Sequence, residues 1–342
     1  MALHPLYTNS HVHSPYSFSS FQSIQEMIDL SVKDEVKVLG INDFYSTKGF
    51  SEFSSLSIKN KIFPLLNIEF LAFSSEKCRE GVRINDFVNP GRMYFVGKGL
   101  DYEKSLSLCE SKVFKNSIIS QKKRINKIIE KANDYFFDKN TKEVVTYENI
   151  KLNNAKDFVG ERHVAREIKK VFNLHSLSEE EIRNNILKRG GPAFVEESED
   201  NFLSVNECIK IIRDAGGLPC YPVLLDGKNG EITEYERNFE QLYENLSRIE
   251  VRHLDIIPDR NDARVLEKFI NFFDKKGFFI LFGSEHNTNE RKRIRVTHKN
   301  GIELDKKLVE ISYKGCCSVV SYNNKNKEHQ IEIGDEIIKS LI

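Results

Sequence analysis

Along the chain, short apolar stretches alternate with segments whose apolar residues recur at helical spacing. The opening unit predicts a strand over Tyr7 to His13, an amphipathic helix over Ile24 to Val32 and a second strand over Val36 to Asn42. Ser23 and Glu26 have the spacing of a capping box, which predicts where this helix begins. The order of these elements indicates one β-α-β unit.

Later apolar stretches repeat the pattern of strands separated by helices. Each is rich in β-branched, aromatic or leucine residues, which favour strands; the candidates are Ile62 to Phe70, Arg92 to Val96, Leu218 to Leu224, Arg248 to Ile257 and Phe278 to Phe282. Alternation of this kind is expected of parallel strands linked by crossover helices. The sequence therefore predicts an α/β fold, either a sheet or a barrel.

The middle of the chain differs from both ends. Between Gly99 and about Asn201 it consists of long helical segments rich in Lys, Glu and Asn, such as Gln121 to Tyr135 and Ser178 to Leu187. The strand pattern then resumes, after a helix that ends at Gly216. These changes predict a discontinuous β/α unit formed by residues 1–98 and 202–342, with a helical insertion at residues 99–201.

Composition and charge narrow the class of protein. The 342 residues suffice for one or two domains, and 51 basic side chains balance 51 acidic ones. Such a balance argues against strong non-specific binding to nucleic acid. Six cysteines without C-x-x-C spacing indicate reduced thiols. Since no apolar run is long enough to span a membrane and no leader pattern precedes the first strand, we expect a cytoplasmic protein without a membrane partner.

Candidate metal ligands lie where predicted strands end. His11 and His13 are two positions apart in a strand, so their imidazoles point to the same face. Asp43, Glu69 and the pair Glu285-His286 follow other strands. Because β/α barrels place their active sites at this rim, these side chains predict a hydrolytic site for Zn, Mn or Fe. The alternative is that Asp43 and Glu69 cap helices or lie at the surface and that His286 is an ordinary loop residue.

Four segments together resemble the motifs of the PHP (polymerase and histidinol phosphatase) family, in the family's order. They are Asn9-Ser-His-Val-His-Ser-Pro-Tyr-Ser17, Leu39-Gly-Ile-Asn-Asp-Phe44, Leu66-Asn-Ile-Glu69 and Phe282-Gly-Ser-Glu-His286. The resemblance implies a distorted, TIM-like PHP barrel of about seven strands. It also implies that His11, His13, Glu69 and Glu285 are metal ligands, with His286 as an alternative to Glu285.

Two segments of the insertion resemble the branch of this family that contains RNase AM-like nucleotidases and nucleoside-bisphosphate phosphatases. They are Glu161-Arg-His-Val-Ala-Arg166 and Gly190-Gly-Pro-Ala-Phe-Val195. The resemblance implies that the insertion closes over a phosphorylated substrate and that Arg162 and His163 contact its phosphate. The alternative is that these two residues form a structural salt bridge on a solvated helix.

Several positions depart from the family pattern at expected ligands. Phe44, Tyr94 and Asn261 stand where the family has histidine, and Gly217-Leu-Pro-Cys-Tyr-Pro222 replaces a stretch that usually ends in Ala-His-Pro. One metal ion is therefore expected in preference to three. Tyr94 and Tyr221 could line the vacated space and bind substrate, although packing is the favoured interpretation for both.

The resemblance and the residues together favour a metal-dependent phosphoesterase acting on a phosphorylated small molecule, a nucleotide or an oligonucleotide end. Arg162, His163 and Arg260 would hold the phosphate, and His286 or Asp43 would transfer protons. Two alternatives remain open: a hydrolase of a non-phosphate substrate, and a non-catalytic protein of the same fold that binds a ligand or a protein partner.

Overall fold

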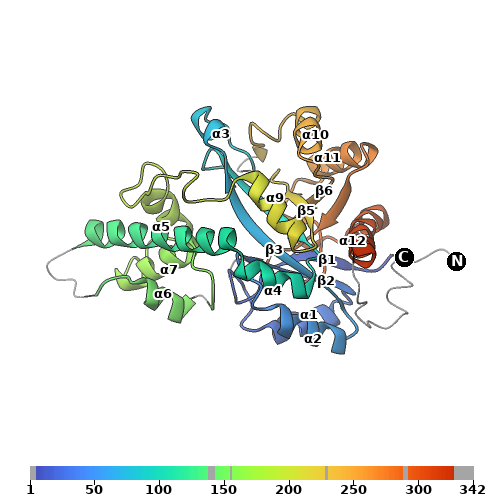
Figure 1. Cartoon of the computed structure of the whole chain (residues 1–342), viewed down its shortest axis with the longest axis horizontal. Helices are drawn as coiled ribbons and strands as arrows, with labels where there is room; N and C mark the ends of the chain where they lie inside the picture. The colour runs from blue at the N-terminus through green and yellow to red at the C-terminus, as the bar shows by residue number, and fades with distance from the viewer. Residues whose placement is uncertain (1–4, 138–142, 155, 228–229, 288–291, 327–342) are drawn as a thin grey trace.

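The computed structural model describes residues 5–137, 143–154, 156–227, 230–287 and 292–326. Its centre is a nearly closed, seven-stranded barrel-like sheet surrounded by helices (Figure 1). The strands follow one another in chain order: β1 (Thr8–Val12), β2 (Val38–Phe44), β3 (Phe63–Phe73), β4 (Arg92–Lys98), β5 (Leu218–Pro222), β6 (His253–Ile256) and β7 (Phe279–Phe282). The predicted α/β, TIM-like class is thereby confirmed.

The segment that follows β7 returns to β1 and completes the barrel. Val12 forms a parallel bridge with Glu285, the backbone N–H of His13 donates to the Glu285 carbonyl at 2.9 Å, and the Glu285 N–H donates to the His11 carbonyl at 2.9 Å. Gly283 permits this approach, because a Cβ atom there would lie 2.2 Å from the Cβ of His11. The Gly-Ser-Glu-His segment therefore lies directly against the two histidines.

Strand direction differs from the expectation at one position. β1 to β3 are parallel to one another, and so are β5 to β7, but β4 is antiparallel to both β3 and β5. Between β3 and β4 the chain forms only the short helix α3 (Ser75–Arg79) and a loop, not a crossover helix that would return it to a parallel start. The prediction of parallel strands throughout is wrong for β4.

Helices cover the outside of the sheet. Those belonging to the barrel are α1 (Ile24–Lys33), α2 (Phe50–Lys59), α4 (Tyr102–Glu110), α9 (Val205–Asp214), α10 (Phe239–Arg248), α11 (Ala263–Lys275) and α12 (Lys306–Asn326), with short 3-10 turns at Pro258–Arg260 and Lys299–Gly301. Ser23 and Ser204 cap α1 and α9 as predicted, and Gly216 (φ +75°) lies just after the end of α9. None of the helices in the described part of the chain has both the length and the apolar character needed to cross a membrane.

A second group of helices lies to one side of the barrel (Figure 1). It comprises the long helix α5 (Lys112–Phe136), α6 (Tyr147–Asn154), α7 (Glu161–Val171), α8 (Glu179–Ile182) and the π-helical turn η1 (Arg183–Leu187). Their inward side chains form a hydrophobic cluster of their own, which includes Ile128, Val164 and Leu187, separate from the main core. This group is thus held together by its own buried apolar side chains.

Candidate metal centre

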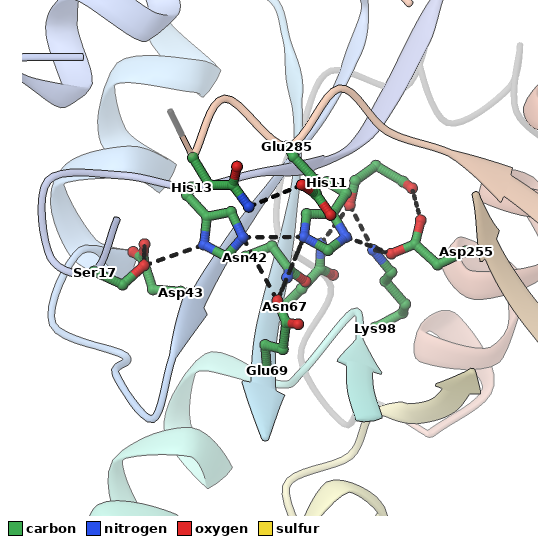
Figure 2. Close-up of polar contacts among 12 residues, drawn as sticks. His11, His13, Ser17, Asn42, Asp43, Asn67, Glu69, Lys98, Asp255 and Glu285 are labelled. Carbon is green, nitrogen blue, oxygen red and sulfur yellow. Dashed lines mark hydrogen bonds and ion pairs between the residues drawn. The ribbon is translucent and has the colours of Figure 1, made fainter. Parts of the chain in front are cut away.

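Three side chains converge at the mouth of the barrel. His11 lies on β1, His13 follows it directly, and Glu69 lies on the adjacent part of β3 (Figure 2). The Nε2 atoms of His11 and His13 are 3.3 Å apart, and Glu69 Oε2 lies 3.4 Å from the first and 3.5 Å from the second. All three side chains are buried. The structure therefore brings together three of the four predicted metal ligands.

The size of this triangle fits a metal ion. A tetrahedral ion with bonds of about 2.0–2.1 Å to nitrogen and oxygen has ligand atoms about 3.3–3.4 Å apart. The observed separations of 3.3–3.5 Å match one face of that tetrahedron without movement of the side chains. Two imidazoles and a carboxylate are also a common ligand set for Zn, Mn and Fe. The residues present therefore fit a single divalent ion.

A buried ion pair behind His11 fixes the orientation of its ring. His11 Nδ1 lies 2.6 Å from Asp255 Oδ2 on β6, and the same oxygen accepts from Lys98 Nζ on β4 at 2.7 Å. Lys98 is completely buried and also donates to the carbonyl of Ser10. A carboxylate on one ring nitrogen selects the tautomer whose other nitrogen can bind a metal. His11 is thus aimed with Nε2 into the triangle.

The ionisation of the two imidazoles differs. Burial lowers the pKa of His11, but the carboxylate of Asp255 outweighs it and raises that pKa to about 9. Burial and the neighbouring His11 hold the pKa of His13 well below its usual value. A cation bound to His11 Nε2 would therefore displace a proton near neutral pH, whereas His13 is already neutral.

Asp43 supports His13 from outside the triangle. Its carboxylate accepts from the backbone N–H of Ser14 at 2.8 Å and from the hydroxyls of Ser14 and Ser17, and the Ser17 hydroxyl lies 3.1 Å from His13 Nδ1. Burial raises the pKa of Asp43 to about 7. Asp43 is not among the residues that line the cavity described below. Its position is that of a residue that orients His13 through Ser17, not of a proton donor to a substrate.

Glu285 lies beside the triangle, and its carboxylate is bound by two other side chains. Glu285 Oε2 accepts from Arg260 Nη1 and from Asn287 Nδ2, both at 2.8 Å. Although burial alone would raise the pKa of Glu285, Arg260 and the two histidines lower it to about 2. Among the described residues, the group whose ligand atoms lie close enough together to bind one ion consists of His11, His13 and Glu69, without Glu285. The predicted fourth ligand is thus engaged with a cation of the protein.

A cavity of about 480 Å³ opens in front of the three ligands. Its cationic lining residues include Arg162, Arg183, Lys188 and Arg260. Arg260 pairs with Asp226 and Glu285, whereas Arg183 and Lys188 form no ion pair with a carboxylate among the described residues. Arg162 donates to the Asn287 carbonyl at 2.9 Å, and burial together with Arg183 lowers its pKa to about 10. Arg183 and Lys188 therefore add positive charge to a cavity wall that also carries carboxylates, such as Asp86, Glu161 and Glu180.

A buried ion network connects the helical group to the barrel beside this cavity. Arg92 on β4 and Arg124 on α5 both contact Glu161 at the start of α7, at 2.8 and 2.7 Å, and both also contact Glu197. The pKa of Glu161 is lowered despite its burial because these guanidinium groups surround it. The network sets the start of α7, and so Arg162, at the cavity wall. In the segment Glu161-Arg-His-Val-Ala-Arg166, the salt bridges to Arg92 and Arg124 are therefore made by Glu161, the neighbour of Arg162.

Phe44 and Tyr94, two of the positions at which the resemblance implied histidine, carry aromatic side chains on one side of the cavity. Phe44 stacks on His13 with ring centroids 5.6 Å apart, meets Tyr94 edge-on at 5.9 Å and stacks on Phe158 at 5.8 Å. Tyr94 lines the cavity, as does Asn261, whose Nδ2 donates to the Ile257 carbonyl. This side of the cavity thus consists of packed rings, and Tyr94 can both pack and face a ligand.

The remaining predicted site residues lie elsewhere. Tyr221 is completely buried, donates to Glu236 Oε1 at 3.0 Å and does not line the cavity, so the assignment of Tyr221 to substrate binding is corrected to packing. His286 lies between Ser284 Oγ and the Lys292 carbonyl and stacks on Phe21. It is outside the cavity, and neither a ligand nor a proton-transfer role is supported by that position.

His163 is close to the site but faces another surface. Its Nδ1 accepts from the Gly160 N–H at 3.2 Å, its ring packs on Phe18, and burial lowers its pKa to about 3. It lines a separate, open groove of about 1350 Å³ that shares Arg162 and Phe18 with the cavity. Of the two predicted phosphate contacts in this motif, Arg162 reaches the cavity and His163 does not.

Three residues of the centre were not identified from the sequence: Asn42, Lys98 and Asp255. Each is a polar or charged side chain within a buried strand, in Val38–Phe44, Arg92–Lys98 and His253–Ile256 respectively. Charged residues are almost never fully buried unless they are paired. The charges of Lys98 and Asp255, just after and within predicted strands respectively, were therefore a signal that could have indicated these two residues, whereas the uncharged Asn42 gave no such signal.

Comparison with known proteins supports the fold. No family model and no curated protein matches this chain. Among solved structures, it is similar to an amidohydrolase from Chromobacterium violaceum with bound sulfate and no metal, and to a protein described as a metal-dependent phosphoesterase from Bifidobacterium adolescentis. Each has a TM-score of 0.64 and 15% sequence identity, over 90% of this chain and 96% of the other. At this identity the likeness concerns the barrel and its surrounding helices.

Proposed function

We propose that this protein is a metal-dependent phosphoesterase that uses one divalent ion held by His11, His13 and Glu69. The observation that carries the proposal is the triangle of ligand atoms, whose edges of 3.3–3.5 Å suit one ion. The adjoining cavity, with its unpaired cations, suits an anionic substrate. The similar solved structures, one described as a metal-dependent phosphoesterase and one with bound sulfate, are consistent with this chemistry.

The protein's own residues would have distinct tasks. Asp255 and Lys98 hold His11 with Nε2 toward the ion, and Ser17 with Asp43 holds His13. When bound, the ion would polarise a phosphoryl oxygen and lower the pKa of a bound water. Arg162 and Arg260 would bind the other phosphoryl oxygens, since a guanidinium offers a planar fork that matches them.

The helical segment would act as the cover of this site. Its residues Phe158, Arg162, Arg183 and Lys188 face the same cavity as His11 and Glu69 from the barrel. We propose that a substrate enters between these two groups of residues, and that its phosphorylated part is a small molecule, a nucleotide or the end of an oligonucleotide. The closed setting would strengthen each charge interaction with it.

The test is a comparison of metal content and hydrolysis across matched variants. Wild-type protein loaded with Mn²⁺ or Zn²⁺ is assayed against phosphate esters and, separately, against amides and lactones. We expect phosphate ester hydrolysis by the wild type, and loss of bound metal with at least a hundredfold loss of activity in His11→Ala. His253→Ala is the control, because His253 is equally buried but bonds Ser318 outside the cavity.

The outcomes separate the competing functions. Hydrolysis of amides or lactones alone would keep the metal centre and reject the phosphoesterase. A folded wild-type protein that binds neither ion would reject the metal centre and favour a non-catalytic binding protein. Full metal content in His11→Ala would show that the ion is bound elsewhere.

A further inference from the structure

Asn42 lies directly beside the ligand triangle (Figure 2). It is completely buried on β2, and its Nδ2 lies 2.8 Å from His11 Nε2 and 2.9 Å from Glu69 Oε2. Its other terminal atom, Oδ1, is buried without a hydrogen-bond partner among the described residues. A buried acceptor without a partner is unfavourable, so its presence at this site calls for an explanation.

The amide nitrogen faces the same lone pairs that a metal ion would use. His11 Nε2 and Glu69 Oε2 are two corners of the triangle, and Asn42 Nδ2 contacts both of them. With a cation at the triangle, an NH₂ group in this position would point its positive end at the ion. The side-chain oxygen, with two lone pairs, would be favourable there.

A half-turn of the terminal amide would bring Oδ1 to the ligand triangle. The oxygen and nitrogen of an asparagine amide occupy nearly the same space, and rotation about the last torsion has broad minima. Oδ1 gives up no hydrogen bond in the turn because it has none. The turn gives up the two contacts of Nδ2, a cost that the bond between Oδ1 and the cation would have to offset.

We propose that Asn42 is the fourth protein ligand of the metal centre and binds the ion through Oδ1. The inference rests on the proposed metal centre at His11, His13 and Glu69. It assigns to Asn42 the place that the sequence had given to Glu285, whose carboxylate is bound by Arg260 and Asn287. Two imidazoles and two oxygens suit Mn²⁺ or Fe²⁺, and the amide oxygen favours these harder ions over Zn²⁺.

Two other roles for Asn42 lead to opposite results. If the amide only competes with the ion for His11 and Glu69, its removal strengthens metal binding. If it only positions those two side chains through its N–H groups, then every replacement that lacks those groups weakens metal binding equally. A ligand oxygen gives a third pattern, in which loss of the oxygen weakens binding and its retention preserves it.

The experiment is a calorimetric titration of the full chain, stripped by chelator, with MnCl₂ and with ZnCl₂. We expect the wild type to bind about one ion, Asn42→Leu to bind Mn²⁺ at least tenfold more weakly, and Asn42→Asp to bind Mn²⁺ at least as tightly as the wild type. The loss in Asn42→Leu should be larger for Mn²⁺ than for Zn²⁺, because imidazole ligands contribute relatively more to Zn²⁺ binding.

Asn261→Leu is the matched control. Asn261 is a buried asparagine of the same cavity and its Oδ1 also lacks a partner, but it bonds none of the three ligand residues. Its replacement should leave the Mn²⁺ affinity within about threefold of the wild type. Thermal unfolding in chelator shows whether each variant is folded before titration.

The visible spectrum of the Co²⁺-loaded protein supplies a second measurement. We expect the absorption bands of Asn42→Leu to differ from those of the wild type in position or intensity, because one ligand has changed. Unchanged or tighter binding in Asn42→Leu with superimposable spectra would overturn the assignment, as would equal weakening in the Leu and Asp variants. A wild type that binds no ion would instead reject the centre itself.

Discussion

The two sides of the cavity are built from opposite kinds of residue. On one side His11, His13 and Glu69 converge within 3.3–3.5 Å. On the other, Phe44 and Tyr94 pack in contact with each other, and Phe44 also stacks on His13 itself. On the aromatic side, the rings of Phe44 and Tyr94 occupy positions at which the resemblance implied further histidine ligands. With aromatic rings at these positions, the described residues offer one group of ligands, which suits one ion.

The buried carboxylates of Asp255 and Glu236 are held differently. Asp255, behind His11, is buried but lies against Lys98 and His11, and these charges lower its pKa. Glu236 lies under Tyr221 and accepts only from neutral donors, and burial raises its pKa to about 8. The carboxylate behind His11 is thus held ionised by neighbouring charges, whereas folding favours the neutral form of the carboxyl group beneath Tyr221.

Replacement of Lys98 should have the largest effect on this contrast. In Lys98→Met, the carboxylate of Asp255 loses the cation that compensates its burial, so we expect the free energy of unfolding to fall by about 3–5 kcal/mol. Urea denaturation of the metal-free protein measures it. Lys210→Met is the control, because the Lys210–Asp214 pair is exposed and should contribute less than about 1 kcal/mol. Equal losses of stability in both variants would contradict the role of Lys98 in compensating the buried charge of Asp255.

Phe44→His tests whether the aromatic side could accept a second ion. The new imidazole would lie among the rings of His13, Tyr94 and Phe158. We expect metal content to stay near one ion per chain and the free energy of unfolding to fall by about 1–3 kcal/mol. Phe44→Leu separates the loss of ring packing from the gain of a donor. Two ions per chain in Phe44→His alone would contradict the comparison.

The parts of this architecture that could be predicted from the sequence are those set by local patterns. Alternation of strands and helices predicted an α/β fold, either a sheet or a barrel, and two-residue spacing placed His11 and His13 on one face, where the structure has them. Each strand end could be located to within a few residues, which sufficed to predict that Glu69 lies at the same rim as the two histidines. These features depend on residues near one another in the chain.

The parts that could not be predicted depend on pairing between distant strands. The contact of Lys98 with Asp255 arises because β4 and β6 flank β5 in the sheet, which no local pattern specifies. The direction of Glu285 is decided by Arg260 and Asn287, and the reversed direction of β4 by a connection without a crossover helix. The sequence placed polar residues at the rim, but the partner of each was settled by tertiary contacts.

Glu236→Gln should have the smallest effect and an effect of opposite sign to that of Asp255→Asn. Since folding raises the pKa of Glu236 from 4.5 to about 8, its contribution to stability is complete below pH 4.5 and is lost as the pH rises through 8. The wild type should lose up to ~1.4 kcal/mol per pH unit in that window, and Glu236→Gln, which does not titrate, should lose less. At pH 7 we expect Glu236→Gln to be as stable as the wild type, or more stable by about 1 kcal/mol.

Asp255, whose pKa is lowered, contributes stability above its ordinary pKa, so Asp255→Asn should be less stable at the same pH. Urea denaturation of both variants at pH 5, 6, 7 and 8 in chelator measures the difference, and parallel pH profiles for Glu236→Gln and the wild type would show that Glu236 is ionised in the folded protein.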